Sequence, residues 1–411
     1  MSIVLAIELV LIIITARLVA IALLATLQRY YSRPSKDIFY APPLAVLIPA
    51  HNEERVITST VRSVLASEYP AFRIIVINDG STDGTLSELQ RNFTGNPQVL
   101  IVDLPNQGKC LALNRGIELV KEEAFVTVDA DTQVNRNTLR VIAAHLSDNR
   151  IGAIAGNVKV GNRINVLTLF QASEYTYHNW ERRALDLINC QTIVPGAIGC
   201  WRTDLVRMIG GFNGATFAED IDLTFMIHRL GYKVAYEDSA VAYTEAPIDL
   251  CSLVRQRIRW ATGDLQTVWK QRGGIGRSGL FSWIGVPNFF TSHIIVPLLD
   301  VAVPLATILV AMFQLRSNAQ SVRTSAIHLL MLLFLFFLTD ILGSALALMF
   351  EDQEQIILLG MVLVHRVVYR PIIAVAVLSA IWHMVRRDHL EWYALNRTAT
   401  AFTSASRNPM T

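Results

Sequence analysis

Two aspartates, Asp129 and Asp131, follow directly on the apolar run at residues 124–128. A buried strand that ends in two carboxylates is unusual, because ionised groups are rarely buried without partners. Carboxylates in this D-x-D spacing can share one hard cation, and Mg²⁺ or Mn²⁺ commonly takes one or two carboxylates plus substrate phosphates. The motif predicts Mg²⁺ or Mn²⁺ held by both aspartates beside a nucleotide diphosphate, and a solvated turn is the alternative.

Three more polar stretches end apolar runs in the same half of the chain: PAHNEE at 49–54, NDGSTD at 78–83 and NQGKC at 106–110. Glu53 can accept a hydrogen bond from a base or a ribose, and Lys109 is a partner for phosphate. Asp79 ends a strand, and the residues after it can cap the next helix, whose amino end favours an anion. Ordinary strand-to-helix turns remain the alternative for each stretch.

The segment FAEDIDLTFMIHRLGYKV, 217–234, brings three acidic residues, Glu219, Asp220 and Asp222, to the start of a helix. The helix macrodipole favours anions there, so capping alone is one explanation. A general base held near an acceptor hydroxyl also suits a rigid helix end. We assign that role to Asp220.

The stretch QRIRW contains Gln256, Arg259 and Trp260, which lie on one face of a helix. That face offers an amide, a cation for phosphate and an aromatic plate for a sugar ring. An Arg/Trp pair at a membrane surface is the alternative.

The hydrophobic pattern predicts the strands and helices that position these motifs. Between 44 and 245, short apolar runs alternate with segments of helical periodicity. This alternation predicts an α/β domain with a mostly parallel sheet, and ligands of such sheets bind at the carboxyl ends of the strands. The polar stretches all fall at that end of their strand.

Apolar segments flank this domain on both sides. We expect a retained anchor helix at 1–30, amphipathic interface helices with QRIRW at 246–285, a C-terminal membrane region at 286–382 and a tail at 383–411. Within the membrane region the apolar stretches are 286–313, 326–350 and 356–382.

Membrane topology is open at this stage. Arg29, Arg33 and Lys36 follow the anchor and place the α/β domain in the cytoplasm, with Pro34 in a short linker. Three further crossings would put the tail outside, whereas its basic residues favour the inside: Arg386, Arg387, Arg397 and Arg407. The last stretch also contains three residues whose charges are costly in a helix that crosses the membrane: His365, Arg366 and Arg370. Either these charges are paired, or they face a polar path through the protein.

Composition excludes some classes of function. The 411 residues are 52% hydrophobic and 17% charged, which indicates a mixture of soluble domain and membrane segments. With 36 basic and 34 acidic residues and no basic stripe, nucleic acid is not an expected partner. The four cysteines stand singly, so thiolate metal sites are not expected and a reducing compartment is indicated.

Taken in order, PAHNEE, NDGST, DAD, AED and QRIRW resemble the processive family-2 glycosyltransferases, which extend polysaccharides from UDP-sugars. The resemblance covers residues 44–272 and is strongest to poly-β-1,6-N-acetylglucosamine synthases, with cellulose, hyaluronan and chitin synthases as relatives. It implies a GT-A fold, an inverting single displacement and a divalent metal. Two positions depart from the family pattern: Ala218 replaces a threonine before the base, and His51 lies beside the base-binding position.

The resemblance also implies residue roles. Asp79 would contact uracil, Asp129 and Asp131 would bind UDP and metal, and Asp220 would take the acceptor proton. QRIRW would close over the diphosphate and the acceptor sugar. The other implied substrate contacts are Pro49, Glu53, Lys109, Glu219, Gln256, Arg259, Trp260 and the acceptor-stretch residues Cys200, Trp201 and Arg202.

The expected protein is a multi-pass enzyme of a bacterial inner membrane that polymerises a β-linked polysaccharide and exports it. UDP-N-acetylglucosamine is the first choice of donor, and a growing polysaccharide, the lipid bilayer and a small membrane helper are expected partners. UDP-glucose and chitin- or hyaluronan-type synthesis are alternatives. A non-processive transferase acting on a lipid phosphate and a catalytically silent sensor are more distant ones; a sensor would have lost a motif carboxylate, and none is missing.

Overall fold

The computed structural model describes residues 3–30, 37, 39–274, 276, 279–317, 319–351 and 357–386. The linker at Pro34 and the tail beyond Arg386 lie outside the described residues, as do five basic residues used for the topology argument: Arg33, Lys36, Arg387, Arg397 and Arg407.

One eight-stranded sheet forms the centre of the α/β part, with strand order β3-β2-β1-β4-β7-β6-β8-β5. The strands are β1 Leu44–Ala50, β2 Phe72–Asp79, β3 Val99–Leu104, β4 Ala124–Thr127, β5 Thr132–Val134, β6 Ile151–Val160, β7 Gly199–Arg202 and β8 Lys233–Thr244. Strands β1 to β4 pair in parallel, as do β6 and β8. The apolar runs of the central strands are buried on both faces, which is the pattern of a covered parallel sheet.

The α/β fold class predicted from the sequence is confirmed, and the structure adds the direction of each strand. The sheet is mixed, because β7 runs antiparallel to both β4 and β6, and β5 runs antiparallel to β8. Strands β5 and β7 have three and four residues, too few for their periodicity to reveal them in the sequence.

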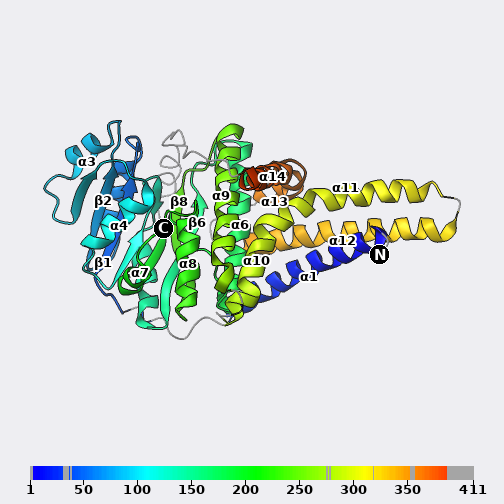
Figure 1. Cartoon of the computed structure of the whole chain (residues 1–411), viewed down its shortest axis with the longest axis horizontal. Coiled ribbons are helices and arrows are strands. Elements are labelled where there is room, and N and C mark those ends of the chain that lie inside the picture. The colour runs from blue at the N-terminus through cyan, green and yellow to red at the C-terminus, as the bar shows by residue number, and fades with distance from the viewer. Residues whose placement is uncertain are drawn as a thin grey trace.

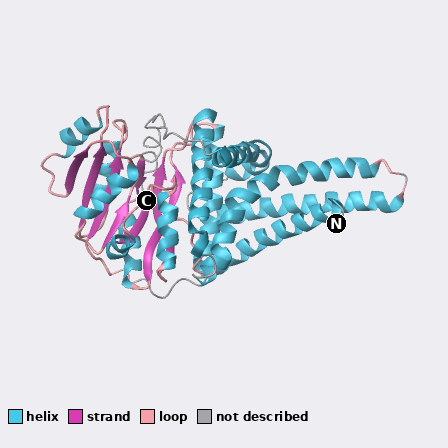
Figure 2. Ribbon diagram, viewed as in Figure 1, coloured by secondary structure: helices cyan, strands magenta, loops and turns pink. Residues whose placement is uncertain are grey.

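Helices cover both faces of this sheet, and alternate side chains of each strand face opposite cores (Figure 2). On one face, α2 and α3 pack with α5, and on the other α4 packs with α7 and α8. Their bounds are α2 Ile57–Leu65, α3 Thr85–Phe93, α4 Lys109–Leu119, α5 Thr138–Ala144, α7 Thr203–Ile209 and α8 Glu219–Arg229.

A second set of helices extends away from the sheet (Figure 1). It consists of α1 Ile3–Tyr30, α6 Val166–Leu187, α9 Leu250–Gln271, α10 Val286–Phe290, α11 Val296–Leu315, α12 Gln320–Phe350, α13 Ile357–Val364 and α14 Arg370–Arg386. Four segments are long and apolar enough to cross a membrane: Val4–Tyr30, Phe281–Leu315, Gln320–Phe350 and His365–Arg386. Among them, α1, α11 and α12 run together along the long axis of the molecule, whereas α14 is seen end-on (Figure 1).

Two long helices separate the sheet from this bundle. Helix α6 packs on β6 and on α1, and α9 packs against α14. Both run across the long axis in Figure 1. They therefore form a layer between the α/β part and the long apolar helices, and they border the site described next.

Candidate active site

The loops after β1, β2 and β3 are joined by hydrogen bonds at the carboxyl end of the sheet. The Asp79 carboxylate accepts from the backbone amides of Gln107 and Gly108, each at 2.9 Å. Gly80 is required beside it, because its φ is +61° and a Cβ would lie 2.3 Å from the Asn106 amide nitrogen. Asp79 thus holds the loop that leads into Lys109, and its assignment as a uracil contact stays a prediction.

The PAHNEE loop is fixed in the same way. Asn52 adopts a positive φ of 58°, and its side-chain oxygen accepts from the Thr82 amide at 2.8 Å. His51 Nδ1 lies 2.7 Å from the carbonyl oxygen of Asp79, and the backbone amide of Glu53 donates to Thr85 Oγ1 at 2.8 Å. Both loops of the predicted nucleotide side are therefore held in one arrangement.

Lys109, the first residue of α4, reaches into a group of carboxylates. Its Nζ lies 2.9 Å from Asp129 Oδ1 and 3.2 Å from Glu219 Oε1. Burial opposes the ammonium charge, but Asp129 and Glu219 more than offset it and raise the pKa of Lys109. The lysine is thus a fixed cation beside the D-x-D motif. Pro49 and Trp201 border a small void beneath Lys109 and Asp129.

The D-x-D carboxylates face one cavity. Asp131 is buried and lies within hydrogen-bond distance of two hydroxyls, Thr132 Oγ1 at 3.2 Å and Thr244 Oγ1 at 3.3 Å. Asp129 is more open and pairs with Lys109. Two hard oxygen donors fit Mg²⁺ or Mn²⁺. In the described part of the chain, no group of three or more His, Cys, Asp or Glu side chains is placed to hold a metal.

Asp220 lies at the start of α8 on the same cavity. One oxygen accepts from the Gly196 amide at 3.2 Å and the other from the Ile221 amide at 2.9 Å. Burial, and then the neighbouring Glu219 carboxylate, raise the pKa of Asp220 to about 7. A carboxylate with a pKa near neutrality is suited to accept a proton at physiological pH.

Helix α9 is docked tightly on the loop that precedes Asp220. A Cβ at Gly263 would lie 2.8 Å from the Ala218 Cβ, and the Phe217 amide donates to Gln266 Oε1 at 3.0 Å. Asp222 accepts from Lys270 Nζ at 2.7 Å and from Gln271 at 2.6 Å. The small side chain of Ala218, a departure from the family pattern, is therefore part of this close contact.

The QRIRW residues face the cavity from α9. Gln256, Arg259 and Trp260 all line it, together with Asp129, Asp131 and Asp220. The guanidinium of Arg257 lies 4.2 Å from the Trp260 ring centroid, which fixes the indole from one side. The structure thus brings the three QRIRW residues to the cavity that the D-x-D motif and the predicted base share.

Of the acceptor-stretch residues, Trp201 borders the small void beneath Lys109 and Asp129, and none of the three lines the large cavity. Cys200 and Trp201 are fully buried within β7, on opposite faces of the sheet. Arg202 pairs with Glu123 and donates to the carbonyl oxygen of Ile151 at 2.7 Å, at the amino end of β4 and away from Asp129. These three residues hold the sheet together, and we leave them out of the proposed site.

The cavity has a volume of about 820 Å³ and extends from the strand ends to the apolar helices. At one end it is lined by Asp129 and Asp220, and at the other by Asp300 and Arg366. Arg366 lies 3.0 Å from Asp340 and 3.3 Å from Asp300. Arg370 lies 3.0 Å from Asp300, so both arginines of the last apolar stretch are paired with carboxylates. Both of them and His365 face the cavity.

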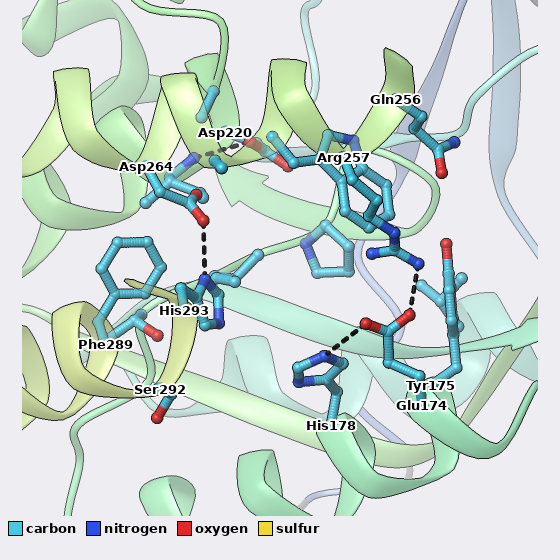
Figure 3. A pocket seen from close by; sticks show the side chains of 18 of the residues that line it. Glu174, Tyr175, His178, Asp220, Gln256, Arg257, Asp264, Phe289, Ser292 and His293 are labelled. Carbon is cyan, nitrogen blue, oxygen red and sulfur yellow. Dashed lines mark hydrogen bonds and ion pairs between the residues drawn. The ribbon is translucent and has the colours of Figure 1, made fainter. Parts of the chain in front are cut away.

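Several cavity residues were missed in the sequence (Figure 3). Glu174 and His178 come from α6, Asp264 from α9 and His293 from the π-helical turn Thr291–Ile295. The residues on α6 and α9 could have been found, because polar residues recur there at spacings of three and four. This spacing puts them on one face of each helix. His293 lies in a long apolar segment and carried no such signal.

A GT-A-like sheet with acidic strand ends and a half-buried carboxylate at Asp220 is the arrangement of a glycosyltransferase, and it adjoins helices long and apolar enough to cross a membrane. The family model described as "Glycosyltransferase like family 2" matches residues 42–263, and the chain belongs to this family. The resemblance noted in the sequence is thereby confirmed.

Similar proteins agree with this assignment. The chain is 30% identical over 223 residues to a poly-β-1,6-N-acetyl-D-glucosamine synthase of Staphylococcus epidermidis, a match that covers 54% of each chain. It is 31% identical over 234 residues to the synthase of the same name from Staphylococcus aureus, which covers 56% of this chain and 57% of the relative. The match thus spans little more than half the length of these relatives.

A solved mannosyltransferase from Pyrobaculum calidifontis, in complex with GDP-mannose and Mn²⁺, shares the fold. The TM-score is 0.58 at 22% identity, and the match covers 85% of this chain and all of the other.

Proposed function

We propose that this protein is a processive, inverting synthase that polymerises a β-linked polysaccharide from a UDP-sugar, with UDP-N-acetylglucosamine as the donor, and passes the product into the membrane. The observation that carries the proposal is the single cavity that joins Asp129, Asp131 and Asp220 to Arg366 between the apolar helices. A transferase that releases its product to the cytoplasm has no use for a polar path between apolar helices.

The proposed reaction is a single displacement. Asp220 accepts the proton of an acceptor hydroxyl, whose oxygen bonds to the anomeric carbon of the donor sugar. The bond from that carbon to the diphosphate oxygen breaks, UDP leaves and the configuration inverts. Lys109 and Arg259 provide positive charge near the diphosphate, and charge stabilisation of this kind commonly contributes more to catalysis than any other single effect. Mg²⁺ or Mn²⁺ held by Asp129 and Asp131 would neutralise the developing charge.

The similar synthases support the choice of donor, because their names specify N-acetylglucosamine polymers. The acceptor would be the growing chain, placed against the Trp260 indole.

The orientation of α14 bears on topology. This helix packs against α9 and α11 and lies across the axis of the long bundle (Figure 1). We propose that it lies along the membrane surface, so that α1, the Phe281–Leu315 segment and α12 make three crossings. With a cytoplasmic α/β domain after the first crossing, the next two crossings return the chain to the cytoplasm after α12. The tail beyond Arg386 would then be cytoplasmic, which removes the conflict between crossing number and basic charge.

The test uses the whole chain in lipid vesicles with Mn²⁺ and radiolabelled UDP-N-acetylglucosamine, with UDP-glucose in parallel. We expect label in high-molecular-weight material from the first donor. Polymer from UDP-glucose would overturn the donor assignment, and formation of a sugar-lipid without polymer would overturn processive synthesis.

A further inference from the structure

Four ionisable side chains gather on the cavity wall where α6, α9 and the π-helical turn Thr291–Ile295 meet. Glu174 and His178 project from α6, Asp264 from α9 and His293 from the turn (Figure 3). All four face the cavity that also contains Asp220, and none belongs to a motif used above. π-Helical turns inside α-helices frequently occur at functional sites, because they re-aim a side chain.

These side chains form two linked couples. His293 Nδ1 lies 2.9 Å from Asp264 Oδ2, and His178 Nε2 lies 3.8 Å from Glu174 Oε1. The two imidazole rings meet edge to face, with centroids 5.8 Å apart and planes at 70°. The arrangement therefore presents two imidazoles side by side; Asp264 orients His293 by a hydrogen bond, and Glu174 lies beside His178.

The charge of Glu174 is already matched. It pairs with Arg257 and accepts from the Tyr369 hydroxyl at 2.8 Å. Burial lowers the pKa of His178 despite the nearby Glu174 carboxylate, so this imidazole is neutral at physiological pH. A neutral imidazole offers one hydrogen-bond donor and one acceptor.

This chemistry matches an uncharged sugar. Hydroxyl and acetamido groups are both donors and acceptors, which a neutral imidazole can satisfy. The Phe289 ring, buried with its centroid 4.4 Å from that of His293, packs against this imidazole and helps to fix its position. A lipid phosphate would require an uncommitted cation, but Arg257 is paired with Glu174. The nearby Asp264 favours the charged form of His293, but any charge on this imidazole is matched by the Asp264 carboxylate.

We propose that Glu174, His178, Asp264 and His293 form a binding subsite for an uncharged sugar unit of the acceptor chain. His178 and His293 would donate to and accept from the sugar, while Glu174 and Asp264 would hold the imidazoles in place. The proposal rests on the proposed function, because it supposes a carbohydrate acceptor in this cavity.

Binding without catalysis tests the subsite directly. The probe is a β-1,6-linked N-acetylglucosamine pentasaccharide, titrated calorimetrically into the whole chain in lipid nanodiscs with no donor present. We expect the wild type to bind, and His178→Ala and His293→Ala each to raise Kd about tenfold, the effect of losing one or two hydrogen bonds. His178→Gln and His293→Gln, which retain a hydrogen-bonding amide, should recover part of the loss.

The matched control is His328→Ala, which removes an exposed histidine of α12 that does not line the cavity. Its Kd should equal that of the wild type. Absence of pentasaccharide binding by the wild type would overturn the subsite, as would unchanged Kd values in the folded Ala and Gln variants. Equal binding of a uronic-acid-containing oligosaccharide would overturn its assignment to uncharged sugars.

The same preparations distinguish this proposal from the proposed function. A wild type that binds the pentasaccharide through the histidines but transfers no sugar from UDP-N-acetylglucosamine would refute the synthase and leave the subsite standing. A wild type that makes polymer, with variants that bind the pentasaccharide normally, would refute the subsite alone.

Discussion

The two ends of the cavity treat charge in opposite ways. At the strand ends, Asp129, Asp131, Glu219 and Asp220 lie around one cavity wall, and Lys109 pairs with Asp129 and Glu219. Negative charge is in excess there, and after burial the neighbouring Glu219 carboxylate is the next cause of the raised pKa of Asp220. Such a wall is suited to bind a cation and to take up a proton.

Between the apolar helices the acids and bases are matched. Arg366 bridges Asp300 and Asp340, and Arg370 lies 3.0 Å from Asp300. Nearer the sheet, Glu181 pairs with Arg17 of α1 at 2.5 Å. Buried charges must be paired to be tolerated, and a paired wall offers hydrogen bonds without strong attraction for ions. This contrast agrees with the proposed function, in which sugar transfer takes place at the strand ends and the neutral product passes between the apolar helices.

The largest effect should come from the base. Asp220→Asn keeps the shape of the side chain but cannot accept the proton, so the rate of sugar transfer should fall by about 10²- to 10⁴-fold. UDP release at saturating donor measures it. The matched control is Asp204→Asn, because this exposed aspartate also lies in the first turn of a helix and accepts from the next amide at 2.8 Å. Equal rates for both variants would remove Asp220 from the mechanism.

Replacing an arginine between the apolar helices should lower the stability of the protein rather than the rate of sugar transfer. Arg366→Leu leaves Asp300 and Asp340 buried without this partner, and we expect the free energy of unfolding to fall by about 3–5 kcal/mol. Thermal unfolding in detergent gives the comparison. Arg323→Leu, at an exposed position of α12, is the control and should have little effect. A loss no greater than that of the control would contradict the view that the membrane-side charges are balanced in pairs.

Metal binding should respond to the groups that orient the D-x-D motif. Thr244→Val removes a hydroxyl within hydrogen-bond distance of Asp131 while keeping the volume, and should raise the Mn²⁺ concentration for half-maximal activity about tenfold. Thr307→Val, in which the lost hydroxyl bonds within α11, serves as the control. The idea fails if both variants need the same Mn²⁺ concentration.

The position of the strand-end residues at one edge of the sheet could be predicted from the sequence for a physical reason. Each polar residue there follows a short apolar strand, so the fold class alone brings Asp79, Lys109 and Asp129 to one edge. The sequence did not reveal that the Asp79 carboxylate accepts from two backbone amides, and its role as a uracil contact stays a prediction. Short strands β5 and β7 also escaped detection.

For the part of the cavity that lies between the apolar helices, the sequence predicted the apolar segments but not the ion pairs and histidines among them. His293 meets Asp264 and His178 through tertiary packing of three separate elements, which periodicity within one element cannot reveal. Arg366 was noticed as a costly charge, but its partners, Asp300 and Asp340, lie on other helices.

The smallest expected effect is a shift in the pH dependence of sugar transfer. Asp220 acts as a base only when ionised, so kcat/KM should rise as the pH increases through about 7 and level off above it. Burial is the larger cause of the raised pKa and Glu219 the next. Glu219→Gln should therefore move this acidic limb to lower pH, because a neutral neighbour no longer opposes ionisation of Asp220.

The control for this variant is Glu118→Gln, an exposed acid of α4 that should leave the limb in place. A limb that stays near pH 7 in Glu219→Gln would mean that burial alone sets the pKa of Asp220. The excess of negative charge would then matter for the cation and for Lys109 but not for the base, and the contrast between the two ends of the cavity would rest on metal binding.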